Sequence, residues 1–118
     1  MRNQIPRLRQ NAFQRQNGRC FYCTVRMWLV SPTELSAEAP SLRAAQLVRC
    51  TAEHLQARCE GGADVPANIA AACAHCNHTR HKRKAPPAPE AFAQQVRKRV
   101  AVGAWHSRWV HERGLLDR

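Results

Sequence analysis

Acidic residues are scarce in this chain, in which eight Asp and Glu stand against 19 Lys and Arg and the formal net charge is +11. An excess of this size favours a polyanion such as nucleic acid as the partner, rather than an acidic protein. Many small basic proteins are merely well solvated, however. The charge by itself therefore leaves both interpretations open.

Long apolar runs are also missing. No stretch is long enough to span a bilayer, and we find neither a lipidation signal nor an apolar secretory leader. These absences argue against a membrane protein and lead us to expect a cytoplasmic one. A chain of 118 residues makes a single domain, 1–118, that buries about two-thirds of its unfolded surface. A bound structural metal ion would stabilise so small a core.

Four of the six cysteines form two CxxC pairs, which are Cys20, Cys23, Cys73 and Cys76. This spacing presents two thiolates from each pair to a tetrahedral Zn²⁺. Disulfides or redox pairs are the alternatives, but paired CxxC motifs in a cytosolic chain favour metal binding. Four cysteines leave no open coordination position, so this zinc would be structural. Cys50 and Cys59 lie outside the set, and we interpret them as a buried small residue and a loop residue.

Between Cys50 and Lys84 a Glu53-His54 pair, a Gly61-Gly62 loop, Asn68 and the run Cys76-Asn77 follow one another. In this order, and with the upstream CxxC pair, the chain resembles the HNH endonucleases over roughly its middle half. That family has a ββα-metal (His-Me finger) core of two short strands and a helix around one divalent cation.

The resemblance assigns positions residue by residue. His54, Asn68 and Asn77 stand at the first, second and third motif positions, and Glu53 stands where the family usually has Asp. The third position holds Asn where some members have His. The family relationship implies that DNA is hydrolysed to 5′-phosphate and 3′-hydroxyl ends.

The chemistry of these side chains agrees with that assignment. A neutral imidazole, with an ordinary pKa of about 6.5, can take a proton from water near pH 7, so His54 is our candidate general base. Glu53 offers hard oxygen ligands that suit Mg²⁺ or Mn²⁺, with Ni²⁺ as a further candidate. Side chains alternate along a strand, so Glu53 and His54 should point to opposite faces.

Asn77 and His81 are four residues apart, so on a helix they share one face and can reach the same cation. We expect the amide of Asn68 to hold the His54 ring by accepting from one ring nitrogen. Plainer interpretations remain open: both Asn residues occur often at turns and helix caps, and His81 belongs to a basic run.

The basic run after the second CxxC pair is our candidate phosphate-binding surface. It consists of Arg80, Lys82, Arg83 and Lys84. Arg80 stands where relatives often carry Lys. Such contacts would be independent of sequence and would weaken steeply with salt.

Hydrophobic spacing and capping signals predict an α+β fold. A basic N-terminal helix is expected within 1–19 and a zinc-stapled ββα-metal core over 20–84, followed by a C-terminal helical extension over 85–118. The core should have an insert near 31–46 that begins with a capping box at Ser31. The expected strands and helices are 4–16, 47–53, 68–72, 77–84, 90–102 and a stretch containing Trp105 and Trp109. Core packing is the expected role of the two Trp residues, with base stacking as the alternative.

The predicted function is therefore hydrolysis of DNA by an HNH-type endonuclease that uses one catalytic divalent cation beside a structural zinc. A non-catalytic zinc-stapled DNA-binding module is the rival from another class. It would have no need of His54, Asn68 and Asn77 together. RNA is an alternative substrate, because no base-recognition signature separates the two nucleic acids. For a nuclease this small, a protein partner that supplies specificity is a further expectation.

Overall fold

A computed structural model describes residues 3–116 of the chain and confirms the predicted α+β class. The regular elements are α1 (Ile5–Arg15), α2 (Leu42–Gln46), β1 (Cys50–His54), β2 (Ile69–Cys73), α3 (Ala74–His81), α4 (Pro89–Ala101) and α5 (Arg108–Glu112). Short 3₁₀ turns lie at Pro32–Leu35, Arg58–Glu60 and Pro66–Asn68.

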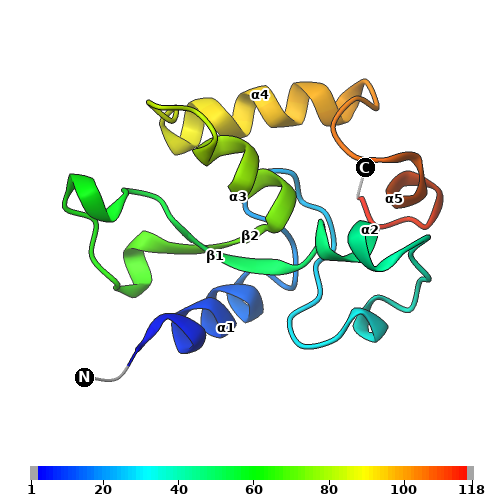
Figure 1. The fold of residues 1–118 in the computed structure, drawn as a ribbon, viewed down its shortest axis with the longest axis horizontal. Coiled ribbons are helices and arrows are strands. Elements are labelled where there is room, and N and C mark those ends of the chain that lie inside the picture. The colour runs from blue at the N-terminus through cyan, green and yellow to red at the C-terminus, as the bar shows by residue number, and fades with distance from the viewer. Residues whose placement is uncertain (1–2, 117–118) are drawn as a thin grey trace.

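The centre of the fold is a two-stranded antiparallel hairpin with a helix on each side. In its register His54 lies opposite Ile69 and Glu53 opposite Ala70. Every residue of β2 is buried, and three of its five side chains are the short ones of Ala. Helices α1 and α3 both contact the hairpin, and Figure 1 shows them on opposite sides of it. The predicted ββα core is present, with each strand shifted by one to three residues from its predicted bounds.

The Gln16 side chain, at the C-terminal cap of α1, ties this helix to the hairpin. The amide nitrogen of Gln16 donates to the carbonyl of Ala71 over 2.9 Å, and the amide oxygen of Gln16 accepts from the Ala71 backbone over 3.0 Å. A central residue of β2 thus gains a backbone-like pair on its outer side. On the inner face of α1, Leu8 and Ala12 are buried.

The insert near 31–46 contains the predicted capping box. Ser31 accepts from the backbone of Thr33, and the Glu34 carboxylate accepts from the backbones of Leu29, Val30 and Ser31. These backbone donors lower the pKa of Glu34 although burial opposes them. Helix α2 then leads directly into β1.

The C-terminal part places two helices over the cysteine-rich end of the hairpin. Phe92 and Val96 of α4 are buried on one face, as their spacing predicts. Helix α5 begins at Arg108, so the prediction of one helical stretch containing both Trp105 and Trp109 is wrong. Trp109 is in the core, whereas Trp105 lies in the connection before α5. Within residues 3–116 no helix is long and apolar enough to cross a membrane.

The loop over residues 55–68 connects the strands and contains a tight turn. Gly61 has φ of 91°, a left-handed conformation that favours glycine. At Gly62 a β-carbon would overlap the carbonyl oxygen of Gln56, so the backbone itself fills the space.

We predict that Gly62→Ala destabilises the protein by about 3 kcal/mol or more, because the added methyl must displace backbone. Gly61→Ala is the control, since there only the positive φ is strained and the cost is about 1–2 kcal/mol. Urea unfolding measures both. Equal destabilisation by the two substitutions would contradict this account of the loop.

Candidate functional site: a hydrogen-bonded His and Glu pair beside a four-cysteine cluster

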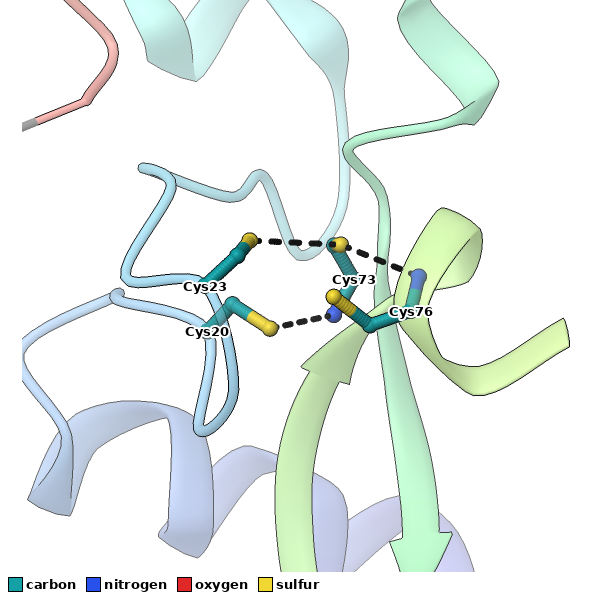
Figure 2. A group of neighbouring side chains, drawn as sticks. All are labelled: Cys20, Cys23, Cys73 and Cys76. Carbon is teal, nitrogen blue, oxygen red and sulfur yellow. Dashed lines mark hydrogen bonds between the residues drawn. The ribbon is translucent and has the colours of Figure 1, made fainter. Parts of the chain in front are cut away.

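The four predicted cysteines lie together at the end of the hairpin. The sulfurs of Cys20, Cys23, Cys73 and Cys76 are all within 4.8 Å of one another, and all four residues are buried. Figure 2 shows the four side chains converging from the loop after α1, the end of β2 and the first turn of α3. The thiols are unpaired, with 3.8 Å between the sulfurs of Cys23 and Cys73. This arrangement confirms the predicted cluster and fits a tetrahedral zinc site.

Backbone donors surround the sulfurs. The sulfur of Cys20 accepts from the backbones of Tyr22 and Cys73 over 3.4 and 3.3 Å, and that of Cys73 accepts from the backbone of Cys76 over 3.4 Å. Burial raises the pKa of Cys73 and Cys76 well above the ordinary value. Burial would do the same to Cys20, but hydrogen bonds from the neighbouring cysteines outweigh it and lower the pKa of that thiol. Four thiols so close together lose all their protons only if a cation offsets the charge.

The two remaining cysteines have other surroundings. Cys50 is buried in β1, where burial raises its pKa to about 12, and Cys59 is exposed in the loop. Both positions agree with the roles predicted for them.

Glu53 is the most enclosed acidic residue of the described chain, with 1% of its surface exposed. Its Oε2 accepts from the Tyr22 hydroxyl over 2.7 Å and from the Arg80 guanidinium over 2.9 Å. Burial and the Glu53 charge raise the pKa of Tyr22, so the phenol stays protonated and donates. The Arg80 charge compensates for the buried carboxylate.

The other Glu53 oxygen contacts a second residue that was predicted to bind the catalytic cation. Oε1 lies 2.8 Å from Nε2 of His81, whose side chain is 34% exposed. A carboxylate oxygen and an imidazole nitrogen thus stand next to each other where solvent can enter. This donor pair suits a divalent cation such as Mn²⁺ or Mg²⁺.

Asn77 is one turn before His81 on α3. Its amide nitrogen donates to the Thr51 hydroxyl over 3.0 Å and to the Ala52 carbonyl over 3.3 Å. These contacts leave the amide oxygen as the atom that could bind a cation. The structure therefore brings Glu53 and His81 into contact and places Asn77 against β1.

His54 contacts a residue that the sequence did not reveal. Its Nε2 lies 2.8 Å from Oδ1 of Asp64 in the loop, and the Asp64 carboxylate is also paired with Arg58 over 3.0 Å. The hydrogen bond with His54, and after it that with Arg58, lowers the pKa of Asp64 although desolvation opposes them. A carboxylate on one ring nitrogen fixes the ring and leaves Nδ1 for another partner.

Asn68 does not take the place predicted for it. Its amide binds both backbone groups of Gln56 and the Ala63 carbonyl, at 2.8 to 3.0 Å. Asn68 thus closes the base of the loop, and Asp64 makes the contact with the His54 ring that we expected from Asn68. Any influence of Asn68 on His54 passes through the loop that carries Asp64.

The phosphate contact predicted for Arg80 does not fit this geometry. Its side chain is 6% exposed, and besides Glu53 it donates to the carbonyls of Pro87, His54 and Leu55. Arg80 is therefore an internal counter-charge. The rest of the predicted basic run, Lys82, Arg83 and Lys84, is exposed immediately after α3.

Two further residues missed in the sequence reach the cysteine cluster from the C-terminal part. The Trp105 indole donates to the sulfur of Cys76 over 3.3 Å, and Nε2 of His106 lies 3.1 Å from the sulfur of Cys23. Burial lowers the pKa of His106 to about 4, so its ring is neutral at pH 7. His75, between Cys73 and Cys76 in the sequence, packs against both rings at interplanar angles of 54° and 53°.

Together these features define a small ββα protein in which a four-cysteine cluster that could hold a metal ion lies at one end of a hairpin and a His-Glu pair at the other. Residues 42–83, from α2 to just past α3, match the family model for HNH endonuclease. The resemblance to the HNH endonucleases inferred from the sequence is thus confirmed over this segment. No curated protein and no solved structure matches the chain.

Because Arg80 balances a buried charge, we predict that Arg80→Ala destabilises the metal-loaded protein by about 3–5 kcal/mol in urea unfolding. Arg83→Ala, at an exposed position three residues later, should stay within about 0.5 kcal/mol of wild type. If both substitutions had the same small effect, Glu53 would not depend on Arg80.

Proposed function

We propose that this protein is a metal-dependent endonuclease that hydrolyses DNA phosphodiester bonds, with His54 as general base. One observation supports this most directly. At the end of β1, adjacent residues form two separate 2.8 Å contacts, His54 with Asp64 and Glu53 with His81. The candidate base and the candidate ligand pair thus lie side by side within a segment that matches a nuclease family.

In this proposal the His54 ring takes a proton from the attacking water through Nδ1, since Nε2 faces Asp64. The water oxygen bonds to phosphorus, the bond from phosphorus to the 3′ oxygen breaks, and the leaving oxygen acquires a proton. Asp64 orients the ring and offsets the positive charge that develops on it. The products carry a 5′-phosphate and a 3′-hydroxyl end.

Glu53, Asn77 and His81 are the residues that would hold the catalytic cation, with Mg²⁺ and Mn²⁺ as first candidates. The chemistry that a bound cation supplies is neutralisation of charge on the phosphate and the leaving oxygen. Glu53 is pre-oriented for this role by Tyr22 and Arg80, which hold its other oxygen. A glutamate is longer than the usual aspartate by one methylene. The two hydrogen bonds to Oε2 hold the additional rotatable bond of the Glu53 side chain in one conformation.

The structural zinc and the DNA contacts belong to the same proposal. Four buried cysteines would hold Zn²⁺ and join the N-terminal loop to the hairpin and α3. Lys82, Arg83 and Lys84 would contact phosphates beside the scissile one. Unpaired CxxC cysteines agree with a cytoplasmic setting, where thiols stay reduced.

We predict that the purified protein nicks or linearises supercoiled plasmid when Mg²⁺ or Mn²⁺ is added after chelation, and that His54→Ala slows cleavage by on the order of 10²- to 10⁴-fold. His78→Ala is the matched control, because His78 is an exposed histidine on α3. Fluorescence anisotropy should show that both variants still bind DNA. If wild type binds DNA but does not cleave it with any of the metals tested, Ni²⁺ included, the protein is a binding module. Faster cleavage of RNA would assign it that substrate instead.

Asp64 can be tested through the rate of cleavage. Asp64→Asn should lower the rate on the order of 10- to 100-fold, because a neutral amide offsets no charge on the His54 ring. Arg58→Ala keeps the His54 contact and should leave the rate near that of wild type. Equal rates for Asp64→Asn and wild type would show that Asp64 only packs the loop.

A further inference from the structure

The connection between α4 and α5 brings an indole N–H group and an imidazole ring nitrogen to the cysteine cluster. Trp105 donates from Nε1 to the sulfur of Cys76, and Nε2 of His106 lies against the sulfur of Cys23. These cysteines belong to different CxxC pairs, and both rings lie outside the matched segment 42–83. The C-terminal connection therefore reaches across both halves of the cluster.

The contacts of the four sulfurs divide into two sets. In the described part of the chain, backbone N–H groups donate to Cys20 and Cys73, whereas the ring nitrogens of Trp105 and His106 contact Cys76 and Cys23. A divalent ion bound by four thiolates carries a net charge of −2, which is costly in a buried site. N–H donors to sulfur offset that charge. The two rings therefore contact the two sulfurs, of Cys76 and Cys23, to which no backbone N–H group is seen to donate in the described part of the chain.

The rings are held in place by their neighbours. The Trp105 ring centroid lies 4.7 Å from that of His75 and 6.1 Å from that of Phe92 on α4. His106 is 9% exposed, and its ring centroid lies 5.3 Å from that of His75 in a tilted arrangement. After α5, the backbone of Arg26 donates to the Leu115 carbonyl over 2.7 Å, next to the first CxxC loop. The segment is thus anchored on both sides of residues 105–106.

We propose that Trp105 and His106 form a hydrogen-bonding lid over the four-cysteine metal site, which slows loss of the metal and couples metal binding to docking of the C-terminal part. The rings do not ligate the metal. They donate to the thiolates of Cys76 and Cys23, and so raise the retention of the ion without adding to its coordination shell. The proposal rests on zinc binding by the cluster and is independent of nuclease activity.

The test compares zinc release from the full-length protein in an excess of a chromogenic chelator. Trp105→Phe keeps an aromatic ring and removes only the N–H donor, and Trp109→Phe makes the same change at a buried Trp in the core. We expect Trp105→Phe to release zinc on the order of ten times faster than wild type or more. Trp109→Phe should release it at the wild-type rate. Equal release from the two variants would overturn the lid.

His106 gives a second, separate measurement. His106→Leu should accelerate release, and His106→Gln, which restores an N–H donor, should recover part of the loss. Replacing zinc by Co²⁺ reports the ligands themselves: wild type should show a four-thiolate spectrum, and Trp105→Phe should shift its sulfur-to-metal charge-transfer band. A three-thiolate, one-imidazole spectrum would overturn the lid by making His106 a ligand. Wild-type protein that retains no zinc would overturn the lid together with the zinc assignment.

Discussion

The convergence of four cysteine sulfurs within 4.8 Å is the constraint on which the rest of the structure depends. Cys73 ends β2 and Cys76 lies in the first turn of α3, so the cluster fixes both where α3 begins and how it is rotated. Residues four apart share a helix face, and Arg80 therefore follows Cys76 into the interior. Asn77 and His81 occupy the neighbouring face, toward β1. The four-cysteine end of the fold thereby sets the position of the candidate active-site residues Asn77 and His81, which follow Cys76 on the same helix.

The second constraint is the charge of Glu53. A carboxylate that is 1% exposed requires a partner, and the fold supplies Arg80 and the Tyr22 hydroxyl on one oxygen. The other oxygen is left to His81, at the solvent side. Tyr22 lies between Cys20 and Cys23, so the same loop supplies two thiols and a hydrogen bond to Glu53. The cysteine cluster and the candidate active-site carboxylate are therefore connected through a single short segment.

Features with a fixed spacing were predictable from the sequence. The CxxC pairs, the capping box at Ser31 and the ββα order of the core were all found in the structure. The role of Arg80 was missed because the predicted helix began at Asn77, which grouped Arg80 with a solvated basic run. With a helix from Ala74, the Cys76 to Arg80 spacing would have placed it inside. Asp64 and His106 could not be predicted, because an irregular loop and an 83-residue separation carry no periodic signal.

The central claim is that two metal sites with different roles share this small fold. It is tested most directly by adding Mn²⁺ to the zinc-loaded, ¹⁵N-labelled protein and recording the paramagnetic broadening of its amide signals. The account predicts broadening centred on Glu53, Asn77 and His81, with the signals around the four cysteines retained and zinc still bound. Broadening centred on the cysteines, or none near Glu53, would contradict it.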